Sequence, residues 1–216
     1  MQIICHRGFW NYNENFQNTD EQNTLTAFKC AFSNAYGIET DIRDGREGLI
    51  VSHDIVHKNS LRLESFFEFY KEFGGDLPLA LNIKADGLQI LLKQFLESYN
   101  IRNYFVFDMS VPDALVYLKH SFRVFTRQSE YEKDPSFYDK ACGVWLDEFE
   151  THWINENVIQ RHLDNGKAVC IVSPELHKRD YEKEWQEYKR VNEKFKTDKL
   201  MLCTDYPKEA EEFFNV

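Results

Sequence analysis

The sequence predicts an α/β fold made of a single (β/α)8 barrel of the TIM type. Eight short apolar runs recur along 216 residues, and segments of helical length separate them. Strands that alternate with helices form parallel sheets, and eight such units in a chain of this length match the smaller closed barrels. With 43% hydrophobic and 15% aromatic residues, the chain can fill one sizeable core. We therefore expect one domain over residues 1–216.

The predicted strands are the apolar runs themselves. They cover residues 3–5, 38–41, 79–83, 104–109, 124–127, 144–147, 168–172 and 200–204. A further run at 49–52 follows the second strand too closely for a parallel crossover. Because Asp44-Gly45 is a hairpin-turn signal, we expect a β-hairpin extension in which this run folds back antiparallel. The hairpin would return His53 and Asp54 to the mouth of the barrel.

The segments between the strands carry helical patterns. Residues 24–32, 61–73 and 88–99 repeat apolar side chains at helical spacing, so each predicts a helix that packs one face on the core. Residues 181–196 are densely charged and contain three interspersed aromatic residues: Tyr181, Trp185 and Tyr188. This pattern favours a solvated helix with one packed stripe.

Composition limits the partners and the compartment. The formal net charge is −10, and no block of lysine or arginine is dense enough to follow a phosphate backbone, so we expect no nucleic-acid partner. No apolar run predicts a transmembrane segment, and Met1 is followed by a strand without a leader pattern, so we expect a cytoplasmic protein. Five cysteines, an odd number, favour a reducing compartment over a disulfide framework.

Titratable side chains gather where the predicted strands end. His6 and Arg7 follow the first strand, Glu39 and Asp41 end the second, and His53 follows the hairpin strand. A single histidine after a strand is more often structural than catalytic. Three strand ends that carry such groups indicate one shared site, because catalytic residues of barrel enzymes lie at the ends of the strands.

Two carboxylates in this set predict a metal site. Glu39 and Asp41 are two residues apart on a strand, so their side chains point to the same side. Each carboxylate raises the pKa of the other unless a cation lies between them. Mg²⁺ and Ca²⁺ are cations that prefer such oxygen ligands. The alternative is that one carboxylate pairs with Arg7 or Lys84.

The remaining groups indicate the chemistry. His6 and His53 can serve as a base toward an attacking hydroxyl and an acid toward a leaving alkoxide. Arg7 and Lys84 supply permanent positive charge that suits a phosphoryl group. Metal, two imidazoles and two cations together favour phosphodiester cleavage over sugar isomerisation or aldol chemistry.

Short motifs along nearly the whole chain carry a family resemblance. In order they are His6-Arg7-Gly8, Asn23-Thr24 followed by Ala27-Phe28, Glu39-Thr40-Asp41, His53-Asp54 and Thr204-Asp205-Tyr206-Pro207. The series resembles the ordered motifs of the glycerophosphodiester phosphodiesterase family. This resemblance implies a (β/α)8 barrel of the phospholipase-C-like phosphodiesterase superfamily, acting in lipid metabolism. The implied reaction is metal-dependent hydrolysis of a glycerophosphodiester to glycerol phosphate and an alcohol.

The resemblance also implies residue roles. His6 and His53 would be the general acid and base, Glu39 and Asp41 would hold the divalent cation, and Arg7 would contact the phosphate. In such enzymes a neighbouring substrate hydroxyl attacks phosphorus, and water opens the cyclic intermediate.

The sequence departs from the family pattern in two places. The family's Glu-x-Lys reads Asn82-Ile83-Lys84 here, so the phosphate-contacting lysine is kept but an amide replaces a metal-binding carboxylate. Weaker metal affinity, another ligand such as Asp108 or Asp147, or loss of activity are the possible consequences. The capping insertion after His53-Asp54 is reduced to residues 55–60, which predicts a more open mouth that admits a larger substrate.

Further residues at strand ends are candidates for the pocket. Arg127, Trp145 and Asp147 lie where substrate contacts are expected, although each also suits a structural role, such as an arginine paired with an acid. The five remaining histidines lie in predicted loops or helices, and we expect them to be solvated: His57, His120, His152, His162 and His177.

Two other functions fit the same residues. The first is a phosphodiesterase or lyase of the same superfamily that acts on another lipid or glycan phosphodiester. The second is a catalytically weakened barrel that binds a phosphorylated ligand without turning it over, which the change to Asn82 motivates.

Overall fold

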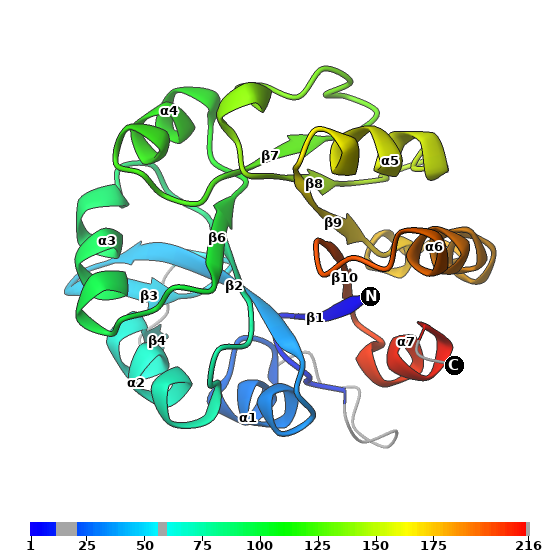
Figure 1. The fold of residues 1–216 in the computed structure, drawn as a ribbon. Helices are drawn as coiled ribbons and strands as arrows, with labels where there is room; N and C mark the ends of the chain where they lie inside the picture. Colours follow the sequence, from blue (N-terminus) through cyan, green and yellow to red (C-terminus); the bar gives the residue numbers. More distant parts are fainter. Residues whose placement is uncertain (12–20, 56–59, 215–216) are drawn as a thin grey trace. The chain divides into compact units, whose positions relative to one another are not determined.

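The structure, a computed structural model, describes residues 1–11, 21–55 and 60–214. Its contacts divide these residues into two compact units. We call Cys5–Val124 the N-terminal unit, and Met1–Ile4 together with Phe125–Val216 the C-terminal unit (Figure 1). The single domain over residues 1–216 stays a prediction. None of the described helices is both long and apolar enough to cross a membrane.

The N-terminal unit contains a mixed sheet with the strand order β4-β3-β2-β5-β6. The β2–β5 and β5–β6 pairs are parallel, whereas the β2–β3 and β3–β4 pairs are antiparallel. The strands are β2 (Gly37–Gly45), β3 (Gly48–Val51), β4 (Leu61–Arg62), β5 (Leu79–Ile83) and β6 (Tyr104–Phe107), and the end of β1 (Gln2–His6) belongs to the same unit.

The predicted hairpin is present, but its turn lies further along the chain than expected. Asp44 pairs with Leu49 and Gly45 with Gly48, so the loop consists of the two residues 46 and 47. Gly48 adopts a φ of 136°, a region that glycine tolerates, and this lets the chain reverse there. The pairing with β2 continues one residue past β3, because the Ser52 amide donates to the Asp41 carbonyl at 3.0 Å. This contact brings the residues after β3 beside Asp41.

Four helices cover the strands of the N-terminal unit: α1 (Leu25–Ser33), α2 (Leu63–Phe73), α3 (Gln89–Ser98) and α4 (Val111–Lys119) (Figure 1). Thr24 caps α1, since its side chain accepts a hydrogen bond from the Ala27 amide. The helix predicted over 61–73 begins only at Leu63, because the two residues before it pair with β3 as β4. Buried aromatic rings join the helices, and Phe28 of α1 stacks on Phe66 of α2 at 4.9 Å between ring centroids.

The C-terminal unit contains a parallel sheet with the order β10-β9-β8-β7. Its strands are β7 (Phe125–Gln128), β8 (Gly143–Leu146), β9 (Ala168–Val172) and β10 (Leu200–Thr204). Its helices are α5 (Glu156–Asp164), α6 (Glu182–Phe195), α7 (Pro207–Phe214) and the short 3-10 helices η2 (Tyr138–Lys140) and η3 (Pro174–His177). Helix α6 buries one stripe, formed by Trp185, Tyr188 and Val191, as its sequence pattern predicts.

All eight predicted strands are present, and they alternate with helices in the predicted order. The cysteines in β1, β9 and β10 are buried in the strands, where each serves as a small apolar side chain.

Candidate active site

The candidate active site lies in the N-terminal unit, where β1 ends at His6. Arg7 and Gly8 turn the chain with φ values of 56° and 85°. The Arg7 amide donates to Glu39 Oε2 at 3.2 Å, and the Arg7 carbonyl accepts from the Asn23 amide at 2.9 Å. The backbone after His6 is thereby fixed against β2, which continues to Gly45 beyond the predicted strand end at Asp41.

Asp41 is fully buried and neutralised by two cations. Arg7 Nε lies 3.3 Å from Asp41 Oδ2, and Lys84 Nζ lies 3.5 Å from Asp41 Oδ1. Asn23 Nδ2 donates to Asp41 Oδ2 at 2.8 Å, while Asn23 Oδ1 accepts from the Thr40 hydroxyl at 2.7 Å. The sequence left open that one of the two carboxylates pairs with Arg7 or Lys84. Asp41 does so, and it pairs with both cations.

Glu39 is the less compensated carboxylate. Its side chain is buried, and Asn82 Nδ2 donates to its Oε1 at 3.1 Å. Burial, reinforced by the charge of Asp41, raises the pKa of Glu39 to about 7, although His6, Arg7 and Lys84 act in the opposite direction. A further positive charge beside Glu39 would favour its ionised form.

The oxygen atoms at this place fit a divalent cation. Asp41 and Asn82 are direct partners in the β2–β5 pair, so the two side chains are neighbours across the sheet. Among the described residues, neither Asp41 Oδ1 nor Asn82 Oδ1 has a hydrogen-bond partner, although both atoms are buried. Buried oxygens normally have partners, and a hard cation provides one.

His53 is held at the same end of the sheet by its backbone. Arg43 donates from Nη1 to the His53 carbonyl at 3.0 Å and from Nη2 to the Lys84 carbonyl at 3.1 Å. The imidazole is 43% exposed, and its Nδ1 lies 2.9 Å from Asp54 Oδ1. The sheet thus brings together the seven predicted residues of this unit: His6, Arg7, Glu39, Asp41, His53, Asn82 and Lys84.

Two residues near this set have roles that the sequence did not assign. Asp108, directly after β6, lies with its Oδ2 3.5 Å from Lys84 Nζ, so it pairs with the same cation as Asp41, and its role as an alternative metal ligand stays a prediction. Asn23 orients Asp41 through the contacts above, and its left-handed φ of 58° places the side chain there. The Asn23-Thr24 motif was the only sequence signal for this role.

The other predicted pocket residues lie in the C-terminal unit. Arg127 Nε bonds to Glu132, and Asp147 Oδ1 lies 2.6 Å from His177 Nε2. Trp145 is buried in β8. Each therefore has a structural environment of its own, and a role of these residues in a substrate pocket stays a prediction. Residues 56–59 of the reduced capping insertion, and His57 with them, lie outside the described residues.

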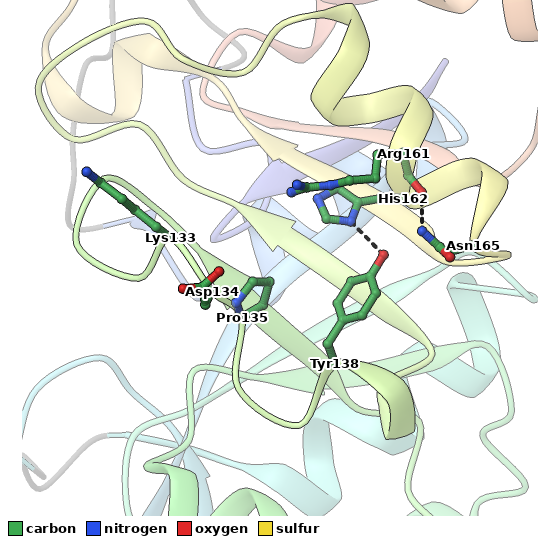
Figure 2. Close-up of a pocket in the computed structure, with 7 residues that line it drawn as sticks. All are labelled: Lys133, Asp134, Pro135, Tyr138, Arg161, His162 and Asn165. Carbon is green, nitrogen blue, oxygen red and sulfur yellow. Dashed lines mark hydrogen bonds between the residues drawn. The ribbon is translucent and has the colours of Figure 1, made fainter.

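A cavity of about 310 Å³ opens on the C-terminal unit, between the loop before β8 and the end of α5. Figure 2 shows Tyr138 and His162 joined by a hydrogen bond, with Arg161 beside His162 and Lys133 further away. His162 is 1% exposed, so the expectation of a solvated histidine was wrong. Its Nδ1 lies 2.9 Å from the Tyr138 hydroxyl and its Nε2 lies 2.8 Å from Gln128 Oε1.

Burial of His162 predicts a loss of stability in acid. Desolvation lowers the pKa of His162 from 6.5 to about 4. The unfolded chain then binds the extra proton between those values, so the contribution is complete above pH 6.5 and is lost as pH falls through 4. The size is about 3 kcal/mol. The free energy of unfolding should therefore drop by about 3 kcal/mol less between pH 7 and pH 4 in a His162→Gln variant than in the wild type. Parallel curves for the two proteins would contradict this prediction.

Comparison with solved structures identifies the fold. A glycerophosphodiester phosphodiesterase from Agrobacterium tumefaciens matches with a TM-score of 0.68 and 13% sequence identity, over 100% of this chain and 99% of that one. A phosphodiesterase from Oleispira antarctica, in complex with the product sn-glycerol-3-phosphate, matches with a TM-score of 0.64 and 14% identity, over 100% and 97%. No protein-family model and no curated protein sequence matches the chain. The predicted (β/α)8 fold is thereby confirmed, and so is the resemblance of this fold to glycerophosphodiester phosphodiesterases.

Proposed function

We propose that the chain is a metal-dependent phosphodiester hydrolase that cleaves glycerophosphodiesters to glycerol phosphate and an alcohol. The observation that carries this proposal is a pair of buried oxygens, Asp41 Oδ1 and Asn82 Oδ1, that have no hydrogen-bond partner among the described residues. Arg7 and Lys84 are ion-paired with the same aspartate. The fold shared with two phosphodiesterases, one of them in complex with sn-glycerol-3-phosphate, supports the same reaction class.

Glu39, Asp41 and Asn82 would hold a divalent cation, Mg²⁺ or Ca²⁺, through two carboxylates and one amide oxygen. A bound cation supplies positive charge to the oxygens of the phosphodiester and lowers the cost of negative charge in the transition state. The same charge would keep Glu39 ionised at neutral pH.

Arg7 and Lys84 would bind the phosphate. Their side chains are 23% and 19% exposed, so each reaches solvent while remaining paired with Asp41. A guanidinium and an ammonium group held side by side suit the two non-bridging oxygens of a diester.

His6 and His53 would move the protons. One imidazole takes the proton of the attacking glycerol hydroxyl, and the other donates a proton to the departing alkoxide, so that a cyclic phosphate and an alcohol result. Water then opens the ring with the two roles exchanged. A proton on His53 Nδ1 would be held by Asp54, which leaves Nε2 to exchange a proton with the substrate.

The proposal is tested with a small panel of glycerophosphodiesters that differ in their alcohol, assayed with Mg²⁺, with Ca²⁺ and with a chelator. We expect metal-dependent release of glycerol phosphate from at least one of them. A cyclic phosphate that accumulates as the end product would indicate a lyase of the same superfamily. No turnover of any diester, together with no bound metal, would favour a barrel that binds a phosphorylated ligand, which the amide of Asn82 motivates.

The replacement Asn82→Glu is expected to tighten metal binding. It adds a negative charge to the ligand set and removes the amide that donates to Glu39, so the metal concentration for half-maximal activity should fall about tenfold. Asn82→Gln is the matched control, because it has the same length without the charge. Equal metal requirements of the Glu and Gln variants would contradict a ligand role for residue 82.

A further inference from the structure

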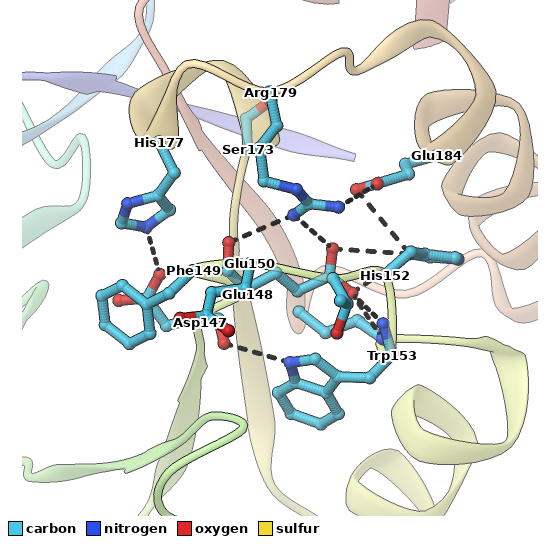
Figure 3. A network of polar contacts seen from close by, with 12 residues as sticks. Asp147, Glu148, Phe149, Glu150, His152, Trp153, Ser173, His177, Arg179 and Glu184 are labelled. Carbon is cyan, nitrogen blue, oxygen red and sulfur yellow. Dashed lines mark hydrogen bonds and ion pairs between the residues drawn. The ribbon is translucent and has the colours of Figure 1, made fainter.

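A second group of metal-ligating side chains lies in the C-terminal unit, and none of its members belongs to the site proposed above. Glu148 and His152 come from the segment after β8, and Glu184 comes from the first turn of α6 (Figure 3). One ligand atom of each lies within 4.8 Å of the other two. His152 Nδ1 is 3.1 Å from Glu148 Oε1 and 3.7 Å from Glu184 Oε2.

Glu148 is rigidly fixed. It is fully buried, and its Oε1 accepts hydrogen bonds from the backbone amides of Trp153, at 2.8 Å, and Ile154. Arg179 Nη1 lies 3.3 Å from its other oxygen. Hydrogen-bonded carboxylates of this kind are typical of metal ligands, whose orientation must be set before the ion arrives.

Glu184 supplies the observation that points to a missing partner. The residue is only 7% exposed. Its Oε1 accepts from Arg179, but among the described residues its buried Oε2 has no hydrogen-bond partner. That oxygen is the one that faces His152 and Glu148 (Figure 3). A buried carboxylate oxygen without a donor carries a free-energy cost that a cation removes.

The second nitrogen of His152 is also positioned. Its Nε2 lies 3.2 Å from Glu187 Oε2, and Glu187 Oε1 accepts from the Glu156 amide at 3.1 Å. A carboxylate on the far nitrogen of an imidazole is the arrangement that orients metal-bound histidines. It holds the proton on Nε2 and leaves the Nδ1 lone pair for a metal.

The charges of the group match a divalent ion. The set contains three carboxylates, of which Glu148 and Glu184 pair with the Arg179 guanidinium and Glu187 contacts His152. Its formal charge is therefore −2 when His152 is neutral.

We propose that Glu148, His152 Nδ1 and Glu184 bind a zinc-type divalent cation, with Glu187 orienting the imidazole. Ligands of a tetrahedral zinc ion, at about 2.0–2.1 Å, lie about 3.3 Å apart, and the two distances from His152 Nδ1 bracket that value. An imidazole among the ligands favours Zn²⁺ or Co²⁺ over Mg²⁺ and Ca²⁺. Binding uses the Nδ1 lone pair, releases to solvent the Nδ1 proton of any imidazolium form, and ties the segment after β8 to α6.

The experiment measures metal content of the whole chain after dialysis against Zn²⁺ in the presence of excess Mg²⁺, which occupies oxygen-ligand sites. We expect one equivalent of Zn²⁺ on the wild type and on His120→Ala, a control that removes a histidine from the other unit. His152→Ala should lose that equivalent. Equal zinc content of wild type and His152→Ala would overturn the proposal.

A second variant covers the case in which His152→Ala does not fold. Glu187→Gln keeps every ligand and removes only the carboxylate on Nε2, so it should weaken Zn²⁺ binding about 10- to 100-fold. The visible absorption of bound Co²⁺ reports the site directly, and its titration midpoint should shift by the same factor. An unchanged midpoint, or a Co²⁺ spectrum without tetrahedral intensity, would show that the group is an ion-pair network alone.

Discussion

Replacing His6 by alanine is expected to lower kcat/KM for a glycerophosphodiester by about 10²- to 10⁴-fold, the usual contribution of a general acid or base. His6 is the last residue of β1, and its charge acts on buried Glu39. The imidazole therefore lies close to the carboxylates proposed to hold the metal. The loss should appear mainly in kcat, because the phosphate contacts proposed for Arg7 and Lys84 do not involve His6.

The measurement is steady-state hydrolysis at saturating Mg²⁺, with metal binding measured on the same preparations. His120→Ala serves as the control, and it should retain wild-type kcat. A catalytic role predicts that His6→Ala still binds the metal while its turnover is lost. A decrease of less than tenfold would remove His6 from the proton-transfer steps.

Replacing Gly8 by alanine is expected to destabilise the protein by about 2–5 kcal/mol, which is large for a single methyl group. Gly8 adopts a φ of +85°, and a Cβ atom there would lie 2.9 Å from the Ala27 Cβ and 3.0 Å from the Ala27 carbonyl carbon. Because Ala27 belongs to α1, the helix and the end of β1 must separate. The shift would displace His6 and Arg7 together.

Gly87→Ala is a matched control for this effect. Gly87 has the same φ of +85°, but no described atom lies within 4 Å of the Cβ it would gain. It should therefore show only the backbone cost, about 1–2 kcal/mol. Urea unfolding of both variants measures the difference in stability. Equal losses would contradict the claim that a Cβ atom at residue 8 clashes with Ala27.

The strands were predictable because each is an apolar run between polar segments, and that pattern is local. The helix predicted from residue 61 began later because Leu61 and Arg62 pair with β3, a contact that helical periodicity does not contain. The hairpin turn moved for a similar reason, since strand register is set by pairing partners as well as by the Asp44-Gly45 signal.

The closeness of Glu39, Asp41 and Asn82 was predictable because all three lie on strands that the sequence indicates, while their role as a metal site stays a prediction. The burial of His162 was not, because it depends on Tyr138 and Gln128, which meet it only in the folded chain. The group of Glu148, His152 and Glu184 could not be predicted for the same reason. Glu148 and His152 are four residues apart, but Glu184 joins them from a helix 32 residues further along the sequence.

The most direct test of the metal-dependent site compares wild type with Asp41→Asn after complete removal of metal by a chelator, with Mg²⁺ then restored stepwise. Asparagine keeps the size of the side chain and removes the charge that pairs with Arg7 and Lys84 and that would hold the proposed cation. The account predicts that wild-type hydrolysis of a glycerophosphodiester disappears on chelation and returns with Mg²⁺, whereas Asp41→Asn recovers none at the same concentrations. Turnover by the chelated wild type, or by Asp41→Asn at the wild-type rate, would contradict it.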